Sequence, residues 1–71
     1  MSEQNRLLSF ALRYPRGWHS CARTDRRAVR AMDALARKGC LDVVRYGRGV
    51  NPQFRLSLPN DVRAMIDNET V

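Results

Sequence analysis

The apolar residues near the start of the chain recur at the spacing of an amphipathic helix. Between Ser2 and Pro15 they fall at positions i, i+3, i+4 and i+7, on one side of a helix. Ser2 is a suitable N-cap, and Glu3 lies where a carboxylate stabilises the positive end of a helix. Pro15 disfavours helical geometry at the residue before it, so we expect the helix to end at Tyr14. The apolar residues of this predicted helix are Leu7, Leu8, Phe10, Ala11, Leu12 and Tyr14.

A second helix, rich in arginine, is predicted between Thr24 and Gly39. Thr24 is the expected N-cap, Asp25 the first helical residue, and Gly39 a left-handed C-terminal cap. At about 100° per residue, the apolar and charged residues separate onto two faces. The apolar face consists of Ala28, Ala31, Met32, Leu35 and Ala36, with Val29 at its edge. The opposite face carries a stripe of Arg26, Arg30, Asp33 and Arg37, flanked by Arg27 and Lys38.

The pattern then changes to that of a β-hairpin. Residues 41–46 are rich in β-branched and aromatic side chains, and residues 53–58 alternate between apolar and polar. Phe54, Leu56 and Leu58 therefore share one face of the second strand. Between the strands, residues 47–52 contain glycine, asparagine and proline, which predicts an extended loop that carries Arg48.

Two shorter segments complete the predicted domain. Residues 18–22 form either a brief strand or a single helical turn, and Trp18 is expected to anchor the core. Base stacking by Trp18 is the less favoured alternative. A final helix is predicted from Asn60 to Asn68, with Val62, Met65 and Ile66 covering the core rather than forming a dimer seam.

These elements predict a single α+β domain that spans residues 1–71. Its helices pack on a two- or three-stranded antiparallel hairpin. A domain of this size buries only about 60% of the surface that its unfolded chain exposes. Folding as a monomer and folding as a homodimer are both left open.

Positive charge is concentrated in the middle of the chain. The formal net charge is +6, whereas residues 13–55 hold eleven cations and three aspartates, a segment net charge of +8. Such a distribution indicates a polyanionic partner, and it favours nucleic acid over a membrane surface. Twelve of the thirteen cations are arginine, whose planar fork suits phosphates and guanine edges. A GC-rich genome, which favours arginine codons, is an alternative reason for that bias.

The chemistry of the remaining residues indicates neither an enzyme nor a metalloprotein. His19 is accompanied by no acid or nucleophile at a recognisable spacing, no phosphate-binding glycine loop is present, and no cofactor is expected. His19, Cys21 and Cys40 fall short of the four ligands of a structural zinc site, so both cysteines are expected to be buried apolar residues. With no signal peptide and no apolar run of about 20 residues, a reduced cytoplasmic protein is expected, with no membrane partner.

The helix carries Ala28, Arg30, Ala31, Met32 and Leu35, and it is followed by residues 38–41 (KGCL) and, after the loop, by residues 54–57 (FRLS). These residues, in the order helix, glycine and hairpin, resemble winged helix-turn-helix transcription regulators of the MarR and PadR types. The resemblance implies a recognition helix followed by a wing. Two features depart from that family: about six residues, 18–23, replace the positioning helix, and the long terminal helices used for dimerisation are absent.

This reading predicts that the chain binds double-stranded DNA, as a small regulator or accessory factor of a prokaryote, a phage or a mobile element. The helix would enter the major groove, and the hairpin loop would reach neighbouring phosphates or the minor groove. The predicted contact residues are Thr24, Arg26, Arg27, Arg30, Arg37, Arg45, Arg48, Asn51 and Gln53.

Other interpretations of the same residues are left open. Arg30, Asp33 and Arg37 have the spacing of an intrahelical ion pair, worth only about 0.2–0.5 kcal/mol. The basic face could instead meet an acidic protein surface, as in a phage-encoded inhibitor. A third alternative is an excisionase-like architectural protein that bends DNA.

Overall fold

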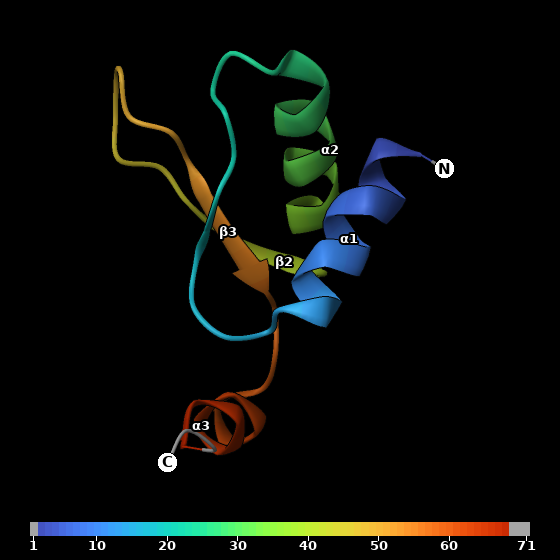
Figure 1. Cartoon of the computed structure of the whole chain (residues 1–71), viewed down its shortest axis with the longest axis vertical. Helices are drawn as coiled ribbons and strands as arrows, with labels where there is room; N and C mark the ends of the chain where they lie inside the picture. The colour runs from blue at the N-terminus through green and yellow to red at the C-terminus, as the bar shows by residue number, and fades with distance from the viewer. Residues whose placement is uncertain (1, 69–71) are drawn as a thin grey trace.

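Among residues 2–68, three helices and three short strands follow one another in the order α1, β1, α2, β2, β3, α3 (Figure 1). The computed structural model describes residues 2–68. The helices are α1 (Glu3–Arg13), α2 (Arg26–Arg37) and α3 (Asn60–Asn68), and the strands are β1 (His19–Ser20), β2 (Leu41–Val44) and β3 (Gln53–Leu56). The predicted α+β class is confirmed, and α3 has the bounds expected from the sequence.

The three strands form one antiparallel sheet with β3 in the centre. In this register Phe54 lies opposite His19 on one side and Val43 on the other, so all three side chains share the inner face of the sheet. Residues 18–22 therefore contribute a strand rather than a helical turn. Both hairpin strands are shorter than predicted: β2 ends at Val44 and β3 at Leu56.

Helices α1 and α2 lie side by side against the inner face of the sheet (Figure 1). The core joins residues of both helices to residues of the sheet, and Met32 of α2 is its largest completely buried side chain. The buried core cluster contains Ala11, Cys21, Ala28, Met32, Leu35, Leu41 and Phe54. The apolar face predicted for the second helix is the face that packs.

Local sequence signals determine where α1 and α2 end. The Ser2 hydroxyl accepts a hydrogen bond from the Asn5 N–H at 3.1 Å, and α1 stops one residue before Tyr14, which precedes Pro15. After α2, Gly39 adopts a φ of 81°, and the Cys40 N–H donates to the Leu35 carbonyl at 2.9 Å. This turn leads the chain from α2 directly into β2.

The N-cap of α2 is Asp25, so the prediction of Thr24 as the cap and Asp25 as the first helical residue is wrong by one position. The Asp25 carboxylate accepts from the Ala28 N–H at 3.1 Å, and the helix starts at Arg26. Thr24 lies in the preceding turn, which closes when the Asp25 N–H donates to the Ala22 carbonyl. Asp and Thr are both good caps, and the turn decides between them by placing Asp25 at the helix start.

Trp18 does not anchor the core, contrary to expectation. It lies at the edge of the sheet with 36% of its surface exposed, and the guanidinium of Arg55 is 4.5 Å from the centre of its ring. Arg55 also donates to Asp42 at 3.1 Å across the outer face of the sheet. Because His19 points inward, its neighbour Trp18 is directed to the outer side.

The expectation that the apolar residues of α3 cover the core is also wrong. Met65 is 68% exposed, and the buried residue of this helix is Arg63. The Arg63 guanidinium donates to the carbonyls of Pro15 and Leu56, beside the ends of α1 and β3. Helix α3 is thus joined to the body by charge-assisted hydrogen bonds, and Figure 1 shows it apart from the other two helices.

We expect Asp25→Ala to lower the free energy of unfolding by about 1 kcal/mol, because the Ala28 N–H loses its partner. Thr24→Ala is the matched control and should change stability by less than about 0.5 kcal/mol. Urea denaturation followed by circular dichroism measures both. A larger loss for Thr24→Ala than for Asp25→Ala would contradict the assignment of the cap.

Candidate nucleic-acid interface

The exposed face of α2 carries a stripe of arginines opposite its buried face. Arg26, Arg30 and Arg37 are spaced four and seven residues apart, so they follow one another along one side of the helix. Arg27 lies beside them near the helix start, and all four are exposed. Within residues 2–68, none of the four forms an ion pair or a side-chain hydrogen bond. Their charge is available to an external anion.

A basic hollow of about 420 Å³ lies beside this stripe, between α2 and the hairpin loop. Three arginines from different segments border it: Arg23 precedes α2, Arg45 follows β2, and Arg48 lies in the hairpin loop. Val29 contributes from α2, and the rest of the lining comes from residues 46–50 and Pro52. In Figure 1 the loop between β2 and β3 extends toward the same end of the molecule as the start of α2. Exposed arginines of α2 and arginines beside the hairpin loop are therefore found at the same end of the molecule.

An ion pair connects the arginine stripe to the hairpin. Asp33, in the middle of the stripe, accepts from the Arg45 guanidinium just beyond β2. The alternative of an intrahelical pair with Arg30 or Arg37 is therefore not what the structure has. Arg45 follows inward-facing Val43 at a spacing of two, which directs it toward α2. The pair fixes Arg45 at the wall of the basic hollow while it neutralises part of the local charge.

Asn51 has a structural role that the sequence did not indicate. Its side-chain oxygen accepts from the Arg23 N–H at 3.1 Å, which ties the hairpin loop to the segment before α2. Next to this contact, the Cys21 N–H donates to the Pro52 carbonyl at 2.9 Å. Arg23 is thereby brought to the hollow, although it was absent from the predicted contact residues. Its position beside Thr24, just before the predicted helix, was the only sequence signal for it.

The other predicted contact residues are placed less directly at this surface. Thr24 is exposed in the turn before α2, next to Arg23. Gln53 is half-buried in the central strand, paired with Ser20 and Val44, and does not line the hollow. The structure thus brings together the arginines of α2 and of the hairpin loop, and leaves Gln53 within the sheet.

Cations outside this region are mostly engaged in contacts within the protein. Arg6 pairs with Glu3 at 3.3 Å, and Lys38 donates to Gln4 at 2.9 Å. Arg55 lies between Asp42 and Trp18, and Arg63 is held by two carbonyls. Arginines with no such partner are therefore concentrated on α2, the segment before it and the hairpin loop.

The cysteines and carboxylates add no second chemical site among residues 2–68. No group of three histidine, cysteine or acidic side chains in that range is arranged to hold a metal ion. No helix in the same range is long and apolar enough to cross a membrane. Cys21 is buried as expected, and Cys40 is only partly buried. Burial raises the pKa of the Cys21 thiol, and the carboxylates of Asp25 and Asp33 raise it further.

No protein-family model, curated protein sequence or solved structure matches this chain at a significant level. What the surface does must therefore be argued from its own charge and geometry.

We expect iodoacetamide at pH 8 to alkylate Cys40 at least about tenfold faster than Cys21. Only the thiolate reacts, and Cys21 is buried and has a raised pKa, which keeps it in the thiol form. The Cys21 pKa rises above its ordinary value of 9.0 on folding, so this thiol makes the folded state less stable as the pH rises through that value. Peptide mass spectrometry gives both rates. Equal rates in the native protein would contradict the burial, whereas equal rates in denaturant are the control.

Proposed function

We propose that this protein binds double-stranded DNA through α2 and the loop between β2 and β3. In this proposal it is a small winged-helix regulator or accessory factor of a prokaryote, a phage or a mobile element, and it acts in the cytoplasm. The observation that carries the proposal is the set of arginines without an internal partner on α2, continuous with the basic hollow beside the hairpin loop. The sheet order, with β3 between β1 and β2, is also compatible with a hairpin that serves as a wing.

The dimensions of the two elements suit a duplex. An α-helix fits the major groove of B-DNA, which is about 12 Å wide, and a hairpin loop alongside reaches the adjacent backbone or minor groove. Arg26, Arg27 and Arg30 occupy the first turns of α2, the part of a recognition helix that contacts base edges. Arg23 and Arg48 border the hollow, where a backbone phosphate would meet two forks at once.

The short segment before α2 determines how deeply the helix would enter the groove. In place of a positioning helix, the chain has one turn that ends at Asp25. Asn51 fixes that turn to the hairpin loop, so α2 and the loop would dock as one rigid unit. Contact with the backbone on the other side of α2 would then fall to Arg37 and Arg27 rather than to a separate helix.

Binding to a duplex should be strongly salt-dependent. Six arginines of this surface lack an ion pair: Arg23, Arg26, Arg27, Arg30, Arg37 and Arg48. If each neutralises one phosphate, log K should fall against log[salt] with a slope of about −5. We expect Arg26→Ala and Arg30→Ala each to reduce the magnitude of that slope by about one, and fluorescence anisotropy on a labelled duplex across salt concentrations measures it.

Arg6→Ala is the control for these variants, because Arg6 is exposed on α1 and pairs with Glu3. It should leave the slope unchanged. The free energy of unfolding of each of the three variants should lie within about 0.5 kcal/mol of that of the original protein, since the substituted residues are exposed. A flat salt dependence, or no binding to any duplex selected from random sequence, would reject DNA binding. A collapse in stability of the α2 variants would show that those arginines are structural.

Asp33→Asn should strengthen DNA binding by about two- to tenfold at a fixed salt concentration. The change removes a carboxylate from the middle of the arginine stripe and releases Arg45 from its ion pair, so one more cation faces the phosphates. Asp42→Asn makes the same change in charge on the outer face of the sheet, where Asp42 pairs with Arg55. The same anisotropy titration compares the two variants, and equal gains would show that only net charge matters.

A further inference from the structure

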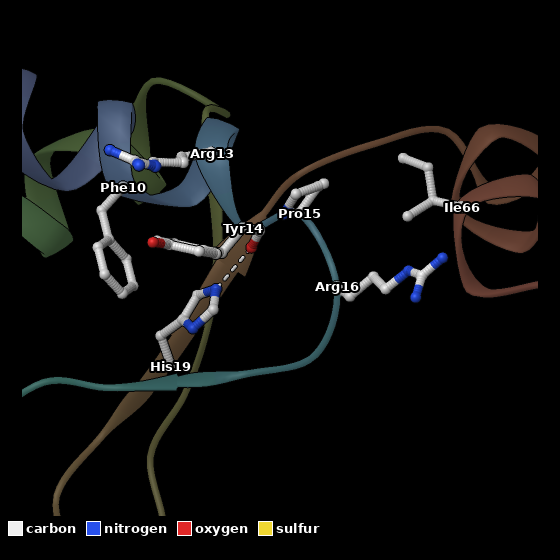
Figure 2. Close-up of a pocket in the computed structure, with 7 residues that line it drawn as sticks. All are labelled: Phe10, Arg13, Tyr14, Pro15, Arg16, His19 and Ile66. Carbon is white, nitrogen blue, oxygen red and sulfur yellow. Dashed lines mark hydrogen bonds between the residues drawn. The ribbon is translucent and has the colours of Figure 1, made fainter. Parts of the chain in front are cut away.

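A hollow of about 730 Å³ opens where α1 ends, between three aromatic rings and helix α3. Phe10 of α1, Tyr14 just after that helix and His19 of β1 form one side of it, and Ile66 of α3 forms the other (Figure 2). The ring centres of Phe10 and His19 are 4.9 Å apart, and His19 Nε2 donates to the Tyr14 carbonyl at 2.7 Å. The hollow therefore has rigid, largely apolar walls.

A second hollow, of about 560 Å³, continues from the first along α1. The two share Phe10, Arg13 and Tyr14, so they form one groove beside this helix. Phe10 is 45% and Tyr14 47% exposed. The half-exposed aromatic rings along this groove offer an apolar surface that a helix with an apolar stripe can cover.

Helix α3 has an apolar stripe that is only partly buried. Val62, Met65 and Ile66 have i, i+3 and i+4 spacing, and Ile66 already borders the hollow. Met65, at the outer edge of the stripe, is 68% exposed. Since Arg63 joins α3 to the body by polar bonds rather than by apolar packing, the stripe is left for a further contact.

The charges of the aromatic hollow and of α3 are complementary. Arg13 and Arg16 border the aromatic hollow, with no carboxylate among the residues that line it. Asp61, in the first turn of α3, is exposed, whereas the one cation of this helix, Arg63, is buried. An acidic helix with an apolar stripe is therefore the kind of partner that suits this groove.

We propose that a second copy of this chain occupies the groove, with α3 of each protomer packed against the aromatic hollow of the other. Met65 of the second copy inserts beside the rings of Phe10 and Tyr14. Because one surface carries both the groove and the stripe, the contact repeats itself across a two-fold axis, as in most homodimers.

Self-association through this groove is separate from the proposed DNA surface and does not rest on it. Helix α3 lies at one end of the long axis, and the start of α2 with the hairpin loop lies at the other end (Figure 1). The molecule is 36 Å long along this axis. A dimer joined at α3 would leave both basic surfaces exposed, and all the measurements below are made without DNA.

The test is sedimentation of the full chain over a range of concentrations, with two variants of α3. We expect a reversible monomer–dimer equilibrium. Met65→Asp should raise the dimer Kd by about tenfold or more, because it places an unpaired carboxylate against the aromatic rings. Ala64→Asp is the matched control: it makes the same change in charge on the opposite, exposed side of α3 and should change Kd by less than about threefold.

A direct measurement of geometry accompanies the titration. In a mixture of isotope-labelled and unlabelled chains, intermolecular nuclear Overhauser contacts are expected between the Met65 methyl group and the Tyr14 ring. The proposal is overturned if the chain stays monomeric up to about 1 mM, or if both variants shift Kd equally. It is also overturned if the chain forms a dimer that lacks these contacts.

Discussion

The packing of Met32 against α1 and the inner face of the sheet is the contact on which the rest of the structure depends. Met32 is completely buried and belongs to one core cluster with Ala11 and Phe54. A domain of this size has little apolar surface to bury, so a single core must hold α1, α2 and the sheet together. Once α2 is fixed by its apolar face, its arginines are directed to solvent.

This packing places the arginines in two kinds of surroundings. Arginines that lie near a carboxylate in space are paired, as Arg45 is with Asp33 and Arg55 with Asp42. Arginines on the outer side of α2 find no such carboxylate among residues 2–68, and their charge stays exposed to solvent. The proposed DNA surface is thus highly charged, whereas the aromatic hollow of the proposed dimer contact is largely apolar.

Most of the secondary structure could be predicted from local sequence, and the errors have specific physical reasons. Periodicity located α2 and α3, and Pro15 and Gly39 marked helix ends, because these signals act over a few neighbouring residues. Trp18 was misplaced because strand β1 is only two residues long, too short for alternation to show which side faces inward. The cap of α2 was misplaced because Thr24 and Asp25 are both good caps, and only the turn from Ala22 distinguishes them.

By itself, the sequence determined the apolar faces of α1 and α2, the basic middle of the chain and the arginine stripe, since periodicity and composition are local properties. Only the tertiary structure decided which cations are free. The pair of Arg45 with Asp33, the bond from Arg23 to Asn51 and the burial of Arg63 join residues that are 12, 28 and up to 48 positions apart. Such contacts depend on how the elements pack, so they cannot be predicted from the residue pattern of a single helix or strand.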